Sequence, residues 1–392
     1  MSPDVVIVGA GILGVATAYH LARMGAGRIT VVDQEGLGAG ATGRSGALIR
    51  SNLDTEAQSR LARFSMEVFR HFDACFGTRS AFEPAGMLTV APAHLGAALS
   101  ALAQRQARWG TDIRAVSAAQ ARTLCPALTL RDGDVVLHEA AAGVGDAQTV
   151  LRGYYERSVA LGVSYRFGFR ADGVAIESGR VTGITGDGSR LAAGRVVLAA
   201  GAWSNPLLAS VGLHLGLVPR LSRLAVFRPS ELPGAGRLPA VIDQEQEAWF
   251  RPMPGGAILV GAERGGQTGV HPSRIPTATS DGFLDAYLAV LCHRFGFARP
   301  IAPRGGWAGV YMLSPDGLPL AGPIPHIAGL YLLGGDHGGA FKLAPALGLG
   351  LAETIVRGRP DTVDLSDFAP ARLLRQPVDM PSCFEPSTTN IA

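Results

Sequence analysis

The sequence predicts a mixed α/β fold in which a parallel-sheet domain is interleaved with an antiparallel-sheet domain. A strand, a glycine-rich turn, a helix and a second strand follow one another within residues 5–33. A buried apolar strand at residues 196–199 leads into a glycine, as strands of parallel sheets do where they bind ligands. Between about residues 219 and 309, short strands are separated by Pro and Gly turns, which is typical of an antiparallel sheet.

The first strand–helix–strand segment has the pattern of a Rossmann-like βαβ unit. An apolar run leads into Gly-x-Gly-x-x-Gly at residues 9–14, and a helical segment and a second apolar strand follow. In this motif Gly9 makes the tight turn, Gly11 lets the backbone approach a pyrophosphate, and Gly14 packs the helix against the strand. Asp33 ends the second strand, at the offset where a carboxylate binds ribose hydroxyls. Glycine-rich turns alone are common, but the whole unit predicts dinucleotide binding.

Two later segments place glycines at the ends of apolar strands. The strand at residues 196–199 leads to Gly201 at its carboxyl end. The strand at residues 330–333 runs into a glycine-rich loop at residues 334–342, and we expect a helix from Pro345 to Val356 after it. The positive end of that helix can face an anionic group.

The remaining periodic segments predict further helices and strands. Helical spacing of apolar residues predicts helices over residues 58–76, 95–109, 118–124 and 283–295, and a helix capped by Asp146 that ends near residue 161. Strands are expected at residues 86–90, 163–169 and 257–261. After about Leu374 the polar tail is expected to be poorly ordered.

Composition favours a compact enzyme. Of 392 residues, 47% are apolar and 17% are charged, which supplies full cores and disfavours a disordered binder. The net charge of +3 is carried by scattered arginines, so we expect no nucleic-acid partner. The N-terminus lacks a basic leader and no apolar run is long enough to span a membrane, so we expect a cytoplasmic protein.

The cysteines and the single lysine also carry information. Four widely separated cysteines form no CxxC pair, so we expect no metal site and no redox dithiol. Lys342 is the one lysine among 35 Lys and Arg residues, and it lies in the glycine-rich loop. Lysine offers a compact ammonium where arginine offers a planar fork, which predicts a role for a point charge. A compositional accident at a solvated helix end is the alternative.

These motifs together resemble the superfamily of FAD-dependent amino acid oxidases, which includes D-amino acid oxidase, glycine oxidase, sarcosine oxidase and dimethylglycine dehydrogenase. The ordered signals that carry the resemblance are GAGILG at 9–14 with Asp33, GRSGALIRSN at 43–52, VVLAAGAWS at 196–204, and SPDGLPLAGP at 314–323 with GGAFKLAP at 338–345. Within the superfamily, residues 43–52 and Phe341–Lys342 look most like the sarcosine oxidase branch, especially the β subunit of its multi-subunit members.

The resemblance implies a Rossmann-like FAD-binding domain interleaved with a substrate domain. The FAD-binding domain is expected at residues 1–80, 143–218 and 310–370, the substrate domain at 81–142 and 219–309, and a tail at 371–392. The residues expected to bind FAD are Gly9, Ala10, Gly11, Ile12, Leu13, Gly14, Asp33, Gln34, Ala41, Thr42, Arg44, Ser45, Gly46, Ala171, Gly201, Trp203, Gly338, Gly339, Phe341 and Lys342.

The resemblance further implies a reaction and its residues. Arg50 and Lys342 are expected to bind a substrate carboxylate, and a hydride would pass from the carbon beside an unprotonated amine to FAD. Water would hydrolyse the resulting imine, and oxygen would be reduced to hydrogen peroxide. Tyr311 either lines the pocket or packs in a core. A dehydrogenase, a β-type subunit with partner chains, and a binding protein without turnover are the alternatives, whereas an NAD-dependent enzyme is disfavoured.

Four positions depart from the relatives within this superfamily. Gly309 and Arg44 stand where relatives carry residues that bond FAD covalently, so we expect noncovalent FAD. Leu259 stands at the position of a lysine that activates oxygen in monomeric sarcosine oxidases, and Glu263 at that of a nearby histidine. Because Leu259 and Glu263 differ from the residues of those relatives, the sequence does not decide whether oxygen or another molecule accepts the electrons. Glu263 either binds a second amine or hydroxyl of the substrate or is a solvated carboxylate at a strand end.

Overall fold

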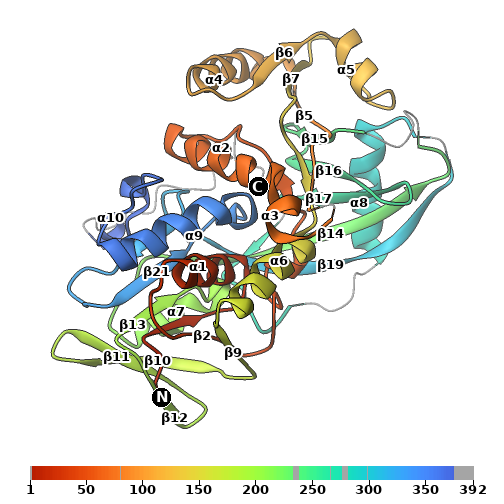
Figure 1. Cartoon of the computed structure of the whole chain (residues 1–392). Coiled ribbons are helices and arrows are strands. Elements are labelled where there is room, and N and C mark those ends of the chain that lie inside the picture. Colours follow the sequence, from red (N-terminus) through yellow and green to blue (C-terminus); the bar gives the residue numbers. More distant parts are fainter. Residues whose placement is uncertain are drawn as a thin grey trace.

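The structure is a computed structural model that describes residues 2–79, 81–232, 238–264, 266–275, 281–297 and 299–374 (Figure 1). The predicted tail beyond Leu374 lies outside the described residues, as does Cys383. The described helices are α1 (Ile12–Arg23), α2 (Glu56–Arg70), α3 (Phe72–Phe76), α4 (Gly96–Arg108), α5 (Ala118–Leu124), α6 (Ala147–Ala160), α7 (Ser204–Ala209), α8 (Asp281–Arg294), α9 (Ala340–Arg357) and α10 (Ala371–Leu374).

A six-stranded, largely parallel sheet contains both strands of the predicted βαβ unit. Its order is β20 (Leu320–Pro323), β21 (Leu330–Gly334), β13 (Arg195–Leu198), β1 (Val5–Val8), β2 (Ile29–Asp33) and β9 (Ser164–Phe167), and β20 alone runs antiparallel to its neighbour. All four residues of β1 are buried, because helices cover one face of the sheet and other elements cover the second. Val5 and Ile7 pack with α1, α6 and α9, whereas Val6 and Val8 pack with residues of α7 and of the hairpin β10–β11.

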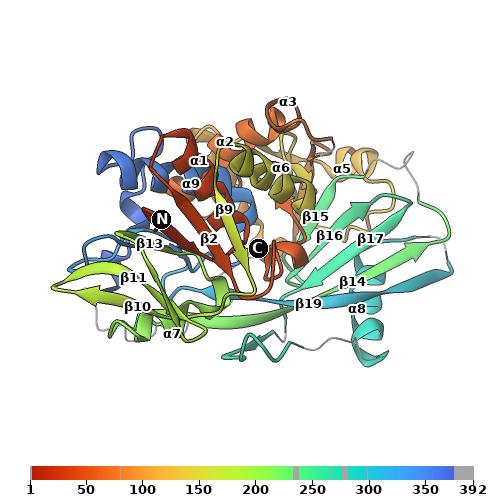
Figure 2. The ribbon, with the colours of Figure 1, turned by 60° about the horizontal axis from the view of Figure 1, so that its bottom comes forward.

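Figure 2 shows this layering from the side, with α1, α6 and α9 on one face of the sheet and β10, β11 and α7 on the other. The second layer is a three-stranded antiparallel sheet of β10 (Ala171–Glu177), β11 (Arg180–Gly186) and β12 (Ser189–Ala192). The predicted helix cap is confirmed: the Asp146 carboxylate accepts the N–H of Thr149 at 2.6 Å at the start of α6.

A nine-stranded sheet forms the second half of the molecule. Its strands, in order, are β18 (Gln267–Thr268), β14 (Val218–Pro229), β17 (Ala257–Ala262), β16 (Ala248–Met253), β15 (Ala240–Asp243), β5 (Met87–Ala91), β7 (Val135–Glu139) and β6 (Ile113–Val116), and β19 (Ile301–Leu313) also pairs with β14. The neighbours are antiparallel, as predicted, except for the parallel pair of β15 and β5. A small sheet of β3 (Leu48–Ile49), β8 (Gly143–Gly145) and β4 (Phe82–Glu83) lies at the junction of the halves.

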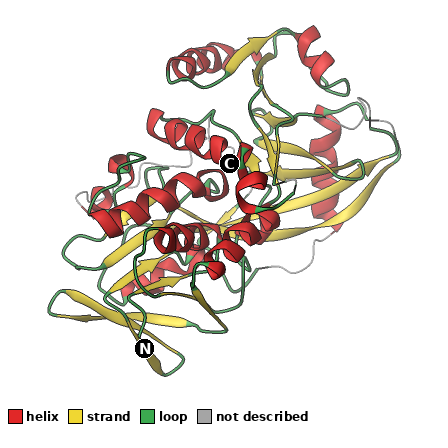
Figure 3. Cartoon of the chain, in the orientation of Figure 1, coloured by secondary structure: helices red, strands yellow, loops and turns green. Residues whose placement is uncertain are grey.

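The two faces of the nine-stranded sheet have different partners. Phe250, Val260 and other residues of one face pack against Phe283 and Leu291 of α8. The alternate residues, among them Trp249 and Leu259, pack against Leu48 on the side of the six-stranded sheet. This second face therefore points toward the six-stranded sheet. Figure 3 shows the helices and strands of both halves in the orientation of Figure 1.

Strands β14 and β19 are long and run through both halves of the molecule (Figure 2). Phe227 of β14 belongs to the core under α8, whereas Met312 of β19 belongs to the core of the six-stranded sheet. The predicted domain boundaries near residues 218 and 309 fall at the start of β14 and inside β19. At these two points the chain runs on through a strand and forms no linker. The division into domains stays a prediction.

A fully buried arginine ties α8 to the sheet. Arg294 is 2% exposed, and its Nε donates to Asp243 Oδ2 at 2.7 Å. Its other nitrogens lie 3.3 Å from Asp134 Oδ2 and 3.4 Å from Glu245 Oε2, and Nη1 donates to the carbonyl of Thr129 at 3.0 Å. Three carboxylates thus neutralise one guanidinium inside this core.

Two predicted helices differ from the structure. The segment 58–76 is interrupted at His71, so it forms α2 and α3. The helix expected to begin at Pro345 begins at Ala340, and this prediction was wrong because Asp336 caps the earlier turn by accepting the N–H of Ala340 at 2.8 Å. Lys342 therefore lies in the first turn of α9 rather than in a loop.

Candidate active site

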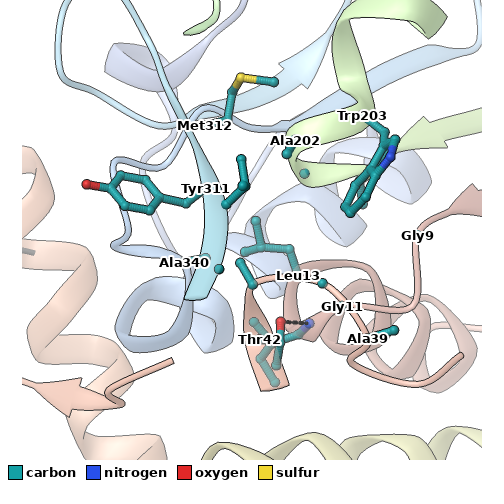
Figure 4. A pocket seen from close by; sticks show the side chains of 18 of the residues that line it. Gly9, Gly11, Leu13, Ala39, Thr42, Ala202, Trp203, Tyr311, Met312 and Ala340 are labelled. Atoms are coloured by element: carbon teal, nitrogen blue, oxygen red, sulfur yellow. Dashed lines mark hydrogen bonds between the residues drawn. The ribbon is translucent and has the colours of Figure 1, made fainter. Parts of the chain in front are cut away.

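A long cavity of about 310 Å3 is lined by residues of both large sheets. This volume lies in the range of small-molecule and cofactor sites. Figure 4 shows the start of α1 beside Thr42, with Trp203 and Tyr311 on opposite sides of the drawn region. The predicted residues that line this cavity are Gly9, Gly11, Ile12, Leu13, Asp33, Gln34, Ala41, Thr42, Arg44, Ser45, Gly46, Ala171, Gly201, Trp203, Glu263, Tyr311, Gly338 and Phe341. Ala10, Gly14, Arg50, Gly339 and Lys342 do not line it.

The glycines of the first motif shape the cavity by allowing close packing. Gly9 has φ of 114°, and a Cβ there would lie 2.2 Å from the carbonyl oxygen of Ala199 on the neighbouring strand. A Cβ on Gly14 would lie 2.1 Å from the carbonyl oxygen of Gly9, which confirms that Gly14 is needed where helix meets strand. Gly14 and Ala10 thus act behind the cavity wall.

The N-terminus of α1 offers an anion site. Gly11, Ile12 and Leu13 line the cavity, and the first turn of the helix contains no acidic side chain. The hydroxyl of Thr42 accepts the N–H of Ile12 at 3.0 Å, which holds the 42–44 segment against the helix start (Figure 4). A helix N-terminus with no carboxylate of its own favours the negative charge of a pyrophosphate.

Asp33 orders the turn on which it stands. Its Oδ2 accepts the N–H of Ala10 at 2.8 Å, and its Oδ1 accepts the N–H groups of Glu35 and Gly36 at 2.9 and 3.1 Å. A carboxylate offers about four acceptor positions, so one position is left for a hydroxyl of a ligand. Asp33 and Gln34 both line the cavity, and ribose binding by Asp33 stays a prediction.

Arg44 and Gly309 lie next to each other in the cavity wall. A Cβ on Gly309 would lie 3.1 Å from Cβ of Arg44, and both residues line the cavity. Arg44 donates to the carbonyls of Ala39 and Gly40, and its own carbonyl accepts the indole N–H of Trp307 at 3.0 Å. Arg44 therefore orders the loop before it. None of the cysteines in the described part of the chain lines the cavity.

An acid–tyrosine cluster, consisting of the buried Glu263 and the half-buried Tyr311 and Asp336, lines another part of the cavity. The Tyr311 hydroxyl donates to Glu263 Oε2 at 3.0 Å, and Nη2 of Arg220 lies 3.3 Å from the same oxygen. Burial raises the pKa of the Glu263 carboxyl, and Arg220 and Tyr311 oppose that rise. Burial also raises the pKa of Asp336. Glu263 is 8% exposed, so it is a buried, paired group rather than a solvated strand end.

Sequence reasoning missed two important residues of the wall. Asp336 stands within Gly-Gly-Asp-His-Gly-Gly, and an acid in a glycine-rich loop at the carboxyl end of a strand is a signal that could have found it. Trp249 lines the cavity from β16, and its ring occupies the space where a Cβ on Gly46 or Gly261 would be, 2.2 Å away in each case. No local pattern indicates such a contact.

Lys342 and Arg50 lie together behind the cavity wall. Lys342 is 4% and Arg50 5% exposed, and Lys342 Nζ lies 3.7 Å from the place where a Cβ of Gly339 would be. Burial, and then the charge of Arg50, lower the pKa of Lys342 to about 7, against the pull of Asp336 and Asp54. Burial also lowers the pKa of Arg50.

Glu139 orders the backbone next to Arg50. It is 3% exposed, and its Oε1 accepts the N–H and the hydroxyl of Ser51 at 2.6 and 2.7 Å. Its Oε2 accepts the N–H of Asn52 at 3.3 Å, and Arg50 donates to the carbonyl of Asn52. The predicted carboxylate-binding arginine is thus held on a fixed segment, although it does not reach the cavity surface.

The fold and this cavity define a class of protein. Residues 4–354 match the family described as DAO, FAD dependent oxidoreductase, and the chain belongs to this family of FAD-dependent oxidoreductases.

The curated proteins to which this chain is similar include glycine oxidases and beta subunits of sarcosine oxidase. The chain is 29% identical to a glycine oxidase of Pseudomonas putida, over 94% of this chain and 99% of the relative. It is 26% identical to sarcosine oxidase subunit beta of Rhizobium meliloti, over 91% of this chain and 85% of the relative. Among solved structures, L-proline dehydrogenase from P. horikoshii shares the fold, with a TM-score of 0.84, 22% identity, and coverage of 95% and 98%.

The cavity fits the FAD that this family uses. The open α1 N-terminus suits a pyrophosphate, the acid at Asp33 suits a ribose, and Gly9 and Gly11 leave room that side chains would fill. In the described part of the chain, no helix has the length and apolar character needed to cross a membrane. Within the same residues, no three His, Cys, Asp or Glu side chains are grouped to hold a metal ion.

Proposed function

We propose that this protein oxidises the C–N bond of a small amino acid or secondary amine. The acid–tyrosine cluster carries the proposal, because it presents a buried, hydrogen-bonded carboxylate to the same cavity that suits FAD. The substrate loses a hydride from carbon and a proton from nitrogen, and water then hydrolyses the imine to a carbonyl compound and an amine. Bound FAD supplies the two-electron acceptor, and oxygen, reduced to hydrogen peroxide, is the final acceptor.

Glu263 is proposed to bind the substrate nitrogen and to take its proton. The Tyr311 hydroxyl and the Arg220 guanidinium both hold Oε2 of Glu263, which leaves Oε1 for the amine. Because burial raises its pKa, Glu263 is a stronger base than a solvated carboxylate. An amine held against this group is deprotonated before hydride loss, as the reaction requires.

Lys342 and Arg50, which do not line the cavity, are proposed to attract the substrate carboxylate electrostatically across the wall at Gly339. Two buried cations side by side repel each other, and a carboxylate that approaches them relieves this repulsion. The chain offers no other lysine, and its ammonium can rotate on a flexible stem. Holding the carboxylate and the amine at separate points orients the substrate carbon and its hydrogen.

Three finer points belong to the same proposal. FAD is held without a covalent bond, since Gly309 and Arg44 offer no cysteine or histidine at the predicted attachment positions. The segments around β1, β13 and β21 form the FAD-binding domain, and most of the nine-stranded sheet forms the substrate domain. The residues of the cavity wall named above are the proposed cofactor contacts.

A dehydrogenase, or a subunit that passes electrons to partner chains, is the second candidate. Leu259 favours it, because this apolar residue is 1% exposed and packs with Trp249 and Leu48 at a position where the resemblance expects a cation. The likeness to sarcosine oxidase subunit beta of Rhizobium meliloti supports a protein with partner subunits.

Anaerobic mixing tests the proposal. Purified protein with its bound FAD is mixed with N-methyl, cyclic and primary amino acids while the visible flavin band is followed. Bleaching by at least one of them supports amine oxidation, and no bleaching by any of them contradicts it. Air is then admitted, and fast recovery of the band indicates an oxidase, whereas slow recovery indicates the dehydrogenase or subunit.

A further inference from the structure

We propose that Arg251 is a positioning residue for bound FAD. It fixes the Gly46 segment of the cavity wall and adds there a positive charge that forms no ion pair with any carboxylate of the described residues. The protein therefore binds the reduced, more negative cofactor more tightly than the oxidised one. The proposal needs bound FAD but no particular amine, and it goes beyond the proposed reaction.

Arg251 connects the two halves of the molecule. It stands on β16 of the nine-stranded sheet, and its Nη1 donates to the carbonyl of Gly46 at 2.8 Å, 205 positions away in the chain. Its Nη2 donates to the carbonyl of Gly145 on β8, also at 2.8 Å. One planar guanidinium therefore joins the Gly46 segment to strand β8 of the small sheet between the two halves.

Strand alternation explains why Arg251 points to this wall. Trp249 and Arg251 are two residues apart on β16, so both lie on the face turned toward the six-stranded sheet, while Phe250 between them packs under α8. Trp249 touches Gly46 and lines the cavity, and Gly46 lines it too. Arg251 does not line the cavity itself, but it donates a hydrogen bond to Gly46, which does.

The charge of Arg251 has no direct counter-ion. In the described part of the chain, its two side-chain hydrogen bonds go to carbonyls and no carboxylate forms an ion pair with it. Its Nε is buried and has no hydrogen-bond partner. The charges of Asp146, whose carboxylate caps α6, and of Glu83 oppose the lowering of the Arg251 pKa, but their effect is smaller than that of burial.

Arg251 is half-buried and forms no ion pair in the described part of the chain, so it attracts an anion that enters the neighbouring space. In a low-dielectric wall its field is weakly screened, whereas the carbonyls that hold it neutralise it only in part. Two-electron reduction of FAD with uptake of one proton adds one negative charge to the flavin. The attraction to Arg251 therefore grows on reduction, which favours the reduced form.

Two substitutions separate the charge of Arg251 from its hydrogen bonds. Arg251→Met removes both, and Arg251→Lys keeps the charge but cannot reach both carbonyls. Arg228→Met is the matched control, since Arg228 is an exposed arginine of β14 in the same sheet. The FAD dissociation constant and the flavin midpoint potential are measured on each protein, with dithionite as reductant and redox dyes as reference, so no amine is used.

We expect Arg251→Met to lower the affinity for reduced FAD at least tenfold more than the affinity for oxidised FAD. A tenfold difference corresponds to a midpoint potential about 30 mV more negative for a two-electron couple. Arg251→Lys keeps the wild-type potential while the protein binds both forms of FAD more weakly, and Arg228→Met changes neither quantity.

Three results would overturn the proposal. The charge has no role if Arg251→Met weakens both redox forms equally, or if Arg228→Met shifts the potential as much as Arg251→Met does. A potential that falls equally in Arg251→Lys and Arg251→Met contradicts the proposal as well. Should Arg251→Met fail to bind FAD, the potential of Arg251→Lys decides. A failure here leaves amine oxidation untouched, because the amine test uses wild-type protein.

Discussion

Arg294 and Arg251 belong to the same half of the molecule, Arg294 fully buried and Arg251 half-buried, and their surroundings are opposite. Arg294 lies between α8 and the outer face of the nine-stranded sheet and is surrounded by Asp243, Asp134 and Glu245. Arg251 lies on the inner face, beside the cofactor cavity, and holds only two carbonyls. Three carboxylates pair with the first charge, whereas no carboxylate in the described part of the chain forms an ion pair with the second.

This difference teaches how to tell a structural charge from a functional one. A buried cation is costly unless paired, so a fold that keeps one unpaired beside a cavity gives up stability there. Lys342 is a third case, because its carboxylates Asp336 and Asp54 offset the burial only in part. The predictions below test this contrast.

The largest effect is expected from Arg294→Met. Removing the guanidinium leaves Asp243, which is fully buried, without its partner at 2.7 Å, and this costs about 3–5 kcal/mol of unfolding free energy. Urea unfolding measures the loss, with the exposed Arg152→Met as control. Arg251→Met should cost less, about 1–3 kcal/mol, since it leaves two carbonyls unpaired but no carboxylate. Equal losses in the two variants would contradict the contrast.

Gly46→Ala is expected to affect the cofactor more than the fold. The new Cβ would lie 2.2 Å from the ring of Trp249, so the ring or the Gly46 segment must move, and the acceptor of Arg251 moves with it. We expect FAD binding at least tenfold weaker, measured by titration of flavin fluorescence.

Gly36→Ala is the matched control for this change, because a Cβ at Gly36 meets nothing within 4 Å. A second variant, Gly46→Ala with Trp249→Leu, removes the ring and should recover part of the affinity. If Gly46→Ala binds FAD as wild type does, the close approach of Trp249 has no role in shaping the wall.

Lys342→Met should remove a pH dependence of stability. The folded pKa of Lys342, about 7, lies below its unfolded value of 10.5, so the unfolded chain binds more protons between these values and stability rises with pH across that window. Below pH 7 both states are protonated and the burial penalty is complete. Wild-type protein should gain about 3 kcal/mol between pH 6 and pH 9 from this group.

Denaturant unfolding at pH 6 and pH 9 gives the free energy of unfolding of wild type and of Lys342→Met. This free energy should lack, in the variant, the rise with pH that Lys342 contributes to wild type. The groups that face Lys342 are Arg50, Asp336 and Asp54. The same variant should raise KM for an amino acid about tenfold or more while leaving KM for the matching amine unchanged. Identical slopes in both proteins would show that Lys342 is solvated and charged throughout.

The smallest effect is expected from Tyr311→Phe. It removes one hydrogen bond to Glu263 Oε2, which raises the pKa of Glu263 further, since that bond opposes the effect of burial. The acid limb of the pH profile for flavin reduction should move to higher pH, with a loss of about tenfold or less at neutral pH. Tyr331→Phe, on β21, is the control. An unmoved acid limb would separate Tyr311 from the titrating group.

Local patterns predicted the part of the fold and site that depends on neighbours in sequence. The βαβ unit, the turn at Gly9, the packing of Gly14 and the Asp146 cap all follow from spacings of a few residues, and the structure confirms them. The family and its cofactor followed from four such motifs in order.

Contacts between distant segments could not be predicted in this way. The start of α9 was misplaced because Asp336 caps it from a loop, while Pro345 suits a helix start elsewhere. Trp249 and Arg251 reach the wall through sheet packing, with partners about two hundred positions earlier in the chain. The sequence placed Lys342 in a loop facing ligand, and only the fold shows it buried in the first turn of α9.

The most direct test of the account is the anaerobic rate of flavin reduction by matched substrate pairs. Sarcosine is compared with dimethylamine, and proline with pyrrolidine, so each pair differs only by the carboxylate. The account predicts that, in at least one pair, the amino acid at limiting concentration reduces the flavin about a hundredfold faster than the matching amine does. The reason is that Lys342 and Arg50 attract its carboxylate. Equal rates within each pair, or faster reduction by the plain amine, would contradict the roles of Lys342 and Arg50.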